Sequence, residues 1–232
     1  MSVLLTHFGN MWRFFCKVSG MAAVGLMLAG QAHAGNVSGV VIDKNGQPVM
    51  DAVVFATPLD TPVPVAKPVE SAVVAQENSA FVPYVSVVRA GTSIRFPNRD
   101  SHDHHLKSFS PAKTFELRVY SKRDEPAPIV FDKTGEVALV CYYHNWMRGF
   151  IYVVDTPYFA KTDKAGNALL SNLPAGKYEV KAWAPTMLGS PLTQTVQVSA
   201  PGTATVQVKY QLNYVPKTAP VAPKMKMEDY SY

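Results

Sequence analysis

Short runs of alternating apolar and polar residues dominate the chain after residue 34. Runs rich in β-branched and aromatic residues, bounded by Gly, Pro, Asn or Asp, predict β-strands. No apolar repeat of helical period and length occurs among them. Many short strands separated by turn signals are typical of β-sandwiches, so the sequence predicts an all-β fold. The predicted strands are 37–42, 53–56, 72–76, 84–88, 92–96, 115–120, 136–141, 150–155, 177–184, 192–198 and 203–210.

The segment 1–34 has the pattern of a secretory signal peptide. Basic Arg13 and Lys17 precede an apolar stretch at 21–29, and the small residues of Ala32-His33-Ala34 follow. We expect cleavage after Ala34, which would make the protein periplasmic or otherwise exported. An uncleaved anchor is the alternative, although the stretch is shorter than the about 20 apolar residues that a span needs. Charges or prolines interrupt every later apolar run, so no membrane span is expected after cleavage.

Charge changes this picture little. The chain has 22 Lys and Arg against 17 Asp and Glu, a net charge of +5. Loss of the leader lowers it to +3, because both charged residues of the leader are basic. The charges are scattered rather than striped, so nucleic-acid binding has little support. A basic balance favours docking to an acidic partner.

Cysteine content points to the chemistry. The leader contains Cys16, so Cys141 is the one cysteine expected in the exported chain, and a disulfide framework is excluded. In the run C-Y-Y-H-N-W-M, a thiol, an imidazole and a thioether recur every three residues, at Cys141, His144 and Met147. A thiolate and imidazole bind copper tightly, and a thioether suits a long, weak axial position. The run therefore predicts a copper site that still lacks one equatorial ligand.

The missing ligand is expected from the other three histidines of the chain after the leader, which crowd into S-H-D-H-H at 101–105. An inward-facing His105 would bring Lys107 beside the metal's apolar shell and bury a charge. An inward-facing His104 has no such cost, because Leu106 and Ser108 then share its face. Strand alternation therefore favours His104.

These considerations assign His104, Cys141 and His144 to the plane of one copper ion and Met147 to the axial position. His105 is a candidate accessory ligand or a brace for the loop that carries the cysteine. His102 and Asp103 are expected to be exposed loop residues. A shell that shields the thiolate from water is expected from Trp146, Tyr143 and Phe150.

The segment 70–155 resembles the cupredoxins, most closely the plastocyanin-like and amicyanin-like blue copper proteins. The matching motifs are F-V-P at 81–83, G-T-S-I-R-F-P-N-R-D at 91–100, T-G-E-V at 134–137 and C-x-x-H-x-x-M at 141–147. The resemblance implies a Greek-key β-sandwich with one type 1 copper ion. It also implies that His104, four residues after Asp100, is the fourth ligand and that electrons leave through His144. The family usually has Asn where this chain has His105.

The two flanks resemble the carboxypeptidase-regulatory-like, or transthyretin-like, sandwich. The first carries G-x-V-x-D-x-x-G-x-P-x-x-x-A-x-V at 39–54, and the second carries T-D-x-x-G at 162–166 and L-P-x-G-x-Y at 173–178. Neither flank alone has enough strands for a sandwich. We therefore expect 35–69 plus 156–213 to form one discontinuous domain into which 70–155 is inserted. Tandem domains joined by the Pro-rich segment 61–68 are the alternative, and the Pro- and Lys-rich segment 214–232 is expected to be a disordered tail.

Taken together, these patterns predict an exported blue copper protein that carries single electrons between redox partners. The resemblance implies a partner of the cytochrome or quinoprotein dehydrogenase type. The alternative is a periplasmic carrier or tolerance protein that captures and delivers Cu(I). An enzyme is not expected, because a nucleophilic Cys141 would need an orienting group and an oxyanion hole, for which no signature appears. A structural zinc site is disfavoured, since methionine is an unusual zinc ligand.

Overall fold

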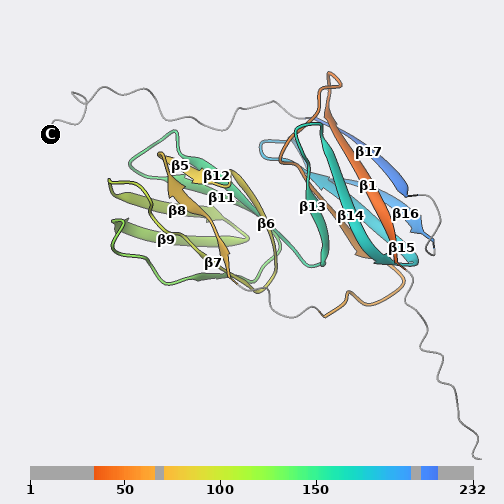
Figure 1. Ribbon diagram of the computed structural model, residues 1–232, viewed down its shortest axis with the longest axis horizontal. Helices are drawn as coiled ribbons and strands as arrows, with labels where there is room; N and C mark the ends of the chain where they lie inside the picture. The colour runs from red at the N-terminus through yellow and green to blue at the C-terminus, as the bar shows by residue number, and fades with distance from the viewer. Residues whose placement is uncertain (1–33, 66–70, 200–204, 214–232) are drawn as a thin grey trace, which may run out of the picture. The chain divides into compact units, whose positions relative to one another are not determined.

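The computed structural model describes residues 34–65, 71–199 and 205–213, and within these ranges the chain forms strands, turns and bends but no helix (Figure 1). This confirms the all-β fold. No described segment is a helix long and apolar enough to cross a membrane. The expected signal peptide, apart from Ala34, and the expected tail at 214–232 lie outside the described residues.

Strands from both flanks of the chain form two sheets around one core. The first sheet has the order β14-β1-β17, with β1 antiparallel to β14 and parallel to β17. The second has the order β13-β2-β15-β16, with antiparallel neighbours. The core between them includes Val41, Leu170, Tyr178 and Tyr210. The strands are β1 (Ala34–Asp43), β2 (Val53–Pro58), β13 (Tyr158–Lys161), β14 (Asn167–Pro174), β15 (Gly176–Trp183), β16 (Leu192–Val198) and β17 (Val206–Leu212).

The middle of the chain forms a five-stranded sheet of order β6-β12-β11-β8-β9 and a three-stranded sheet of order β10-β7-β3. Their apolar side chains meet in one buried cluster that includes Leu106, Leu139, Phe96, Phe131 and Ile151. A short β4-β5 pair completes this part. The strands are β3 (Ala72–Val73), β4 (Ala75–Glu77), β5 (Ala80–Val82), β6 (Val85–Arg89), β7 (Thr92–Arg95), β8 (His104–Ser110), β9 (Lys113–Tyr120), β10 (Ile129–Phe131), β11 (Gly135–Cys141) and β12 (Arg148–Val154).

Several strands differ from the predicted ones. The run at 72–76 is broken at Val74, whose N–H bonds the carbonyl of Arg95, so β3 and β4 join different sheets. β14 was not among the predicted strands, and only Ala175 separates its end at Pro174 from the start of β15 at Gly176. Short β5, β10 and β13 were not predicted, because a few residues carry too little alternation to show a period.

Candidate metal centre

Antiparallel pairing of β8 with β11 places His104 beside Cys141. Cys141 ends β11 opposite Leu106 on β8, and His104 begins β8 two residues away on the same face. Along β8, His104, Leu106 and Ser108 are buried, whereas Phe109 is 75 % exposed. The alternation expected from the sequence is therefore confirmed, and the imidazole of His104 lies within the sandwich.

The loop after β11 carries His144 and Met147 in a tight turn. The N–H of Met147 bonds the carbonyl of His144 at 2.8 Å, and the N–H of Cys141 bonds the carbonyl of Met147 at 3.3 Å. His144 is buried, and Met147 belongs to the same buried cluster as Cys141. The indole of Trp146 packs 5.1 Å from the ring of His144 and donates a hydrogen bond to the carbonyl of Ser79. The loop is thus fixed at both ends and along its length.

The thiol of Cys141 lies between two imidazole nitrogens. Its Sγ atom is 3.7 Å from Nδ1 of His104 and 3.5 Å from Nδ1 of His144. A sulfur and a nitrogen that share one metal in a trigonal plane lie about 3.7 Å apart, for bonds of about 2.3 and 2.0 Å. The two sulfur–nitrogen distances therefore fit a single metal ion, and a thiolate with two imidazoles is a donor set that copper prefers.

A carboxylate orients one of these imidazoles. Oδ2 of Asp100 lies 2.9 Å from Nε2 of His104, and the carboxylate also accepts the backbone N–H groups of Asn78 and Ser79. Burial acts to raise the pKa of Asp100, but these hydrogen bonds outweigh it and hold the pKa below its ordinary value. An ionised Asp100 accepts a hydrogen bond from the N–H of Nε2, which leaves the lone pair of His104 on Nδ1, the nitrogen that faces Cys141.

Burial also keeps the two imidazoles neutral. It lowers the pKa of His144 to about 4, helped by the neighbouring His104 and His102. Burial likewise lowers the pKa of His104, although the hydrogen bond to Asp100 acts in the opposite direction. Both rings therefore carry a free lone pair at neutral pH, which is the form that binds a metal.

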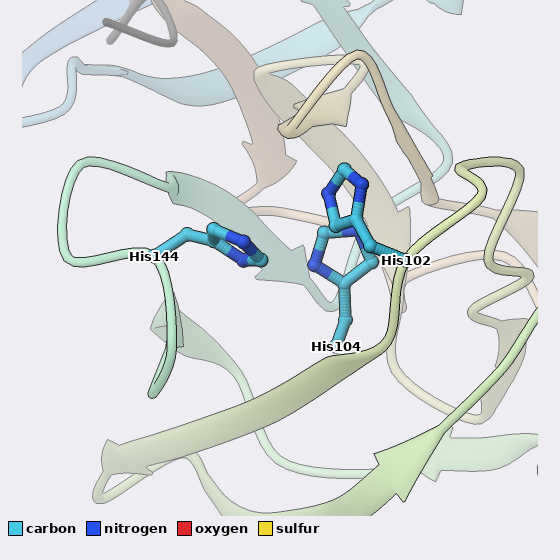
Figure 2. A group of neighbouring side chains, drawn as sticks. All are labelled: His102, His104 and His144. Atoms are coloured by element: carbon cyan, nitrogen blue, oxygen red, sulfur yellow. The ribbon is translucent and has the colours of Figure 1, made fainter. Parts of the chain in front are cut away.

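A third imidazole, that of His102, packs against the rings of His104 and His144. His102, in the loop before β8, has its ring centroid 4.8 Å from that of His104 and 4.9 Å from that of His144. Figure 2 shows the three rings facing one another, and their ligand nitrogens lie within 4.8 Å of one another. His102 and Asp103 both lie in the loop, as expected, but Asp103 is exposed whereas His102 is partly buried, and its 35 % exposed side chain also packs against the other two rings.

His105 lies on the opposite face of β8. Its Nε2 atom is 2.7 Å from Oε1 of Glu116 on β9, and its ring packs 5.5 Å from that of Tyr142. The structure brings His104, Cys141 and His144 together and directs the side chain of His105 away from them.

Two of the three expected shielding residues lie elsewhere. Tyr143 is 54 % exposed, and Phe150 belongs to a different apolar cluster, 5.6 Å from the ring of Tyr84 and 6.2 Å from that of Trp183. Of the three expected shielding residues, only Trp146 packs against a donor residue, His144. The thiol is shielded instead by the buried cluster that contains Leu106 and Leu139.

No protein-family model matches the chain, and no curated protein matches it. Several solved structures are similar to part of the chain, and the three described here each align with less than half of it. The copper-containing nitrite reductase NirK from Thermus scotoductus SA-01 is 22 % identical over 42 % of this chain and a quarter (25 %) of its own length, with a TM-score of 0.35.

Two smaller proteins align over nearly their whole length. A purple cupredoxin from Nitrosopumilus maritimus is 22 % identical and covers 36 % of this chain and 99 % of its own, with a TM-score of 0.33. Amicyanin from Paracoccus versutus is 22 % identical and covers 43 % of this chain and 98 % of its own, with a TM-score of 0.34.

Proposed function

We propose that this protein is an exported type 1 copper protein that carries single electrons between redox partners. The observation that supports this most is the position of Sγ of Cys141, 3.7 and 3.5 Å from Nδ1 of His104 and His144. Met147, buried in the same cluster, is the proposed axial ligand. A bound copper ion would supply a one-electron couple between Cu(I) and Cu(II).

The protein's own contribution is rigidity and exclusion of water. His104 and Cys141 sit on paired strands, and the turn from His144 to Met147 is closed by backbone hydrogen bonds. Buried donors on such a frame move little when the charge at the site changes, which favours fast electron exchange. Asp100 holds the ring of His104 in the tautomer that a metal requires.

We further propose that 70–155 is a copper domain inserted into a carboxypeptidase-regulatory-like sandwich built from 35–69 plus 156–213. Pairing of β1 and β2 with strands that follow residue 155 supports this. Tandem domains would instead require each flank to pair within itself. The proposal includes cleavage after Ala34, a redox protein as partner and no enzymatic reaction.

The second candidate function is capture and delivery of Cu(I), and the third imidazole, His102, favours it. The two functions differ in what reduction does to the metal. An electron carrier retains copper through repeated reduction and oxidation, whereas a delivery protein releases it on reduction or passes it to an acceptor. Cyclic voltammetry combined with metal analysis after each cycle distinguishes them.

Spectroscopy of two variants tests the ligand assignment. Oxidised wild-type protein loaded with Cu(II) should show the intense visible absorption of a copper thiolate, and Cys141→Ser should abolish it. His104→Asn should change the paramagnetic resonance spectrum, while His105→Asn, on the outer face, should not. A wild-type spectrum in Cys141→Ser or His104→Asn would remove that residue from the site. A colourless protein that holds one Zn(II) would refute the electron-transfer function.

A further inference from the structure

Among the three clustered histidines, His102 is the one that solvent reaches. Its side chain is 35 % exposed, whereas His104 is fully buried and His144 is 9 % exposed. A metal ion that approaches the site through this cluster therefore meets the imidazole of His102 before the other two. Figure 2 shows its ring beside those of His104 and His144 rather than apart from them.

The three rings together do not all have the spacing of a bound set. Their ligand nitrogens lie within 4.8 Å of one another, whereas two nitrogens bound to one metal lie at most about 4 Å apart, for bonds of about 2.0 Å. The thiol of Cys141, by contrast, already has the spacing of a bound set with His104 and His144. His102 can bind an ion on its way to these three, but a fully formed site does not need it.

We propose that His102 is a capture ligand, which binds copper first and passes it to Cys141, His104 and His144. This inference rests on the proposed copper site and adds the route by which that site is filled. The ring of His102 is held for this role, because Nε2 lies 3.1 Å from Oγ of Ser79 and 3.7 Å from the carboxylate of Asp100. The negative charge of Asp100 and of exposed Asp103 favours a cation at this point.

The transfer is balanced without a redox reagent. Copper arrives as an aqua ion, and a ring nitrogen of His102 replaces one water. The thiol of Cys141 then releases its proton to solvent and binds as thiolate, His104 and His144 bind through Nδ1, and the bond to His102 breaks. The oxidation state of the copper is the same before and after. The protein gains one metal ion and loses one proton.

Stopped-flow loading of the metal-free full chain with aqueous Cu(II) tests the proposal. Growth of the thiolate absorption reports arrival at Cys141. In the wild type, the rate should level off at high copper concentration, because binding to His102 saturates before transfer. His102→Ala should load at least tenfold more slowly and remain linear in copper, yet reach the same final spectrum.

Two further variants separate metal binding from packing. His102→Gln keeps a side chain that can bond the hydroxyl of Ser79 but offers only a weak amide donor, so it should load as slowly as His102→Ala. His105→Ala removes a neighbouring imidazole that faces Glu116, and it should load as the wild type does.

Three results would overturn the capture role. The first is that His102→Ala loads copper at the wild-type rate, and the second is that His102→Gln does so. The third is a final spectrum of His102→Ala that differs from that of the wild type, which would make His102 a resident ligand. A wild-type protein that binds Cu(II) without a thiolate band would refute the proposed function itself. Failure of the two proposals is therefore distinguishable.

Discussion

Replacement of Asp100 by alanine should weaken copper binding without removing any ligand. The carboxylate accepts a hydrogen bond from Nε2 of His104 at 2.9 Å and so selects the tautomer whose Nδ1 lone pair faces the thiol. Asp100→Ala leaves either nitrogen free to carry the proton. Copper must then bind a ring that is less basic and less well oriented.

The size of the expected loss of copper affinity follows from the one charge-assisted hydrogen bond that Asp100→Ala removes. Such a bond contributes about 1.5–3 kcal/mol, which corresponds to a loss of roughly 10- to 100-fold in affinity. Loss of a partner that orients a metal-bound histidine typically costs the same 10- to 100-fold. Asp100→Asn keeps an acceptor oxygen but no charge, so its affinity should lie between those of Asp100→Ala and the wild type.

Competition with a chromophoric chelator measures the affinity, and a second aspartate supplies the control. Asp163 also accepts two backbone N–H groups in a turn, those of Ala165 and Asn167, but among the described residues it has no hydrogen bond or ion pair with a histidine. Asp163→Ala should therefore lower the free energy of unfolding, as Asp100→Ala does, and leave copper affinity unchanged. Equal affinities for the two variants would show that Asp100 acts only on the loop and not on the ligand.

Three further outcomes are expected. Leu106→Ala should cost about 2–5 kcal/mol of unfolding free energy because Leu106 is fully buried, whereas Phe109→Ala, 75 % exposed, should change it by less than about 0.5 kcal/mol in urea titrations. Gly46 and Gly166 both have positive φ, but a Cβ would meet a backbone carbonyl oxygen only at 166, so thermal unfolding should show a larger loss for Gly166→Ala than for Gly46→Ala. In the metal-free protein, the pKa of His144 is lowered to about 4, so the unfolded chain binds more protons between pH 4 and about 6.5. The stability that depends on His144 should fall as the pH decreases through that window and level off below it, and His144→Gln should reduce the slope within the window.

The residues whose proximity the sequence could predict are those whose positions follow from local geometry. Cys141, His144 and Met147 occupy one short loop, so their proximity is set by chain connectivity. His104 was located by the period of two along a strand, because the neighbouring Leu106 and Lys107 have opposite tolerance for burial. Neither step needed information from distant parts of the chain.

The two-residue alternation did not show which residues of β12 face Cys141, because both faces of that strand are buried. Phe150 and Ile151 are equally apolar, yet Ile151 faces the cluster that contains Cys141 and Phe150 faces the other way. Hydrophobicity alone does not tell one face from the other on such a strand.

The orienting carboxylate of Asp100 was missed for a different reason. Its role depends on the turn at Asn78 and Ser79, about twenty residues earlier, whose N–H groups hold it in place.

The departure from the cupredoxin pattern at His105 has a simple structural consequence. The loop that carries Cys141 is tied to β8 by a backbone hydrogen bond, from the N–H of Tyr142 to the carbonyl of His105 at 2.8 Å. That bond does not depend on which side chain occupies position 105, and the imidazole is free to pair with Glu116 on the outer face. The additional imidazole beside His104 and His144 is that of His102, which precedes the strand and is not constrained by its alternation. A single imidazole at that point supplies a first contact for an incoming ion while leaving the spacing of Cys141 and its two nitrogen partners unchanged.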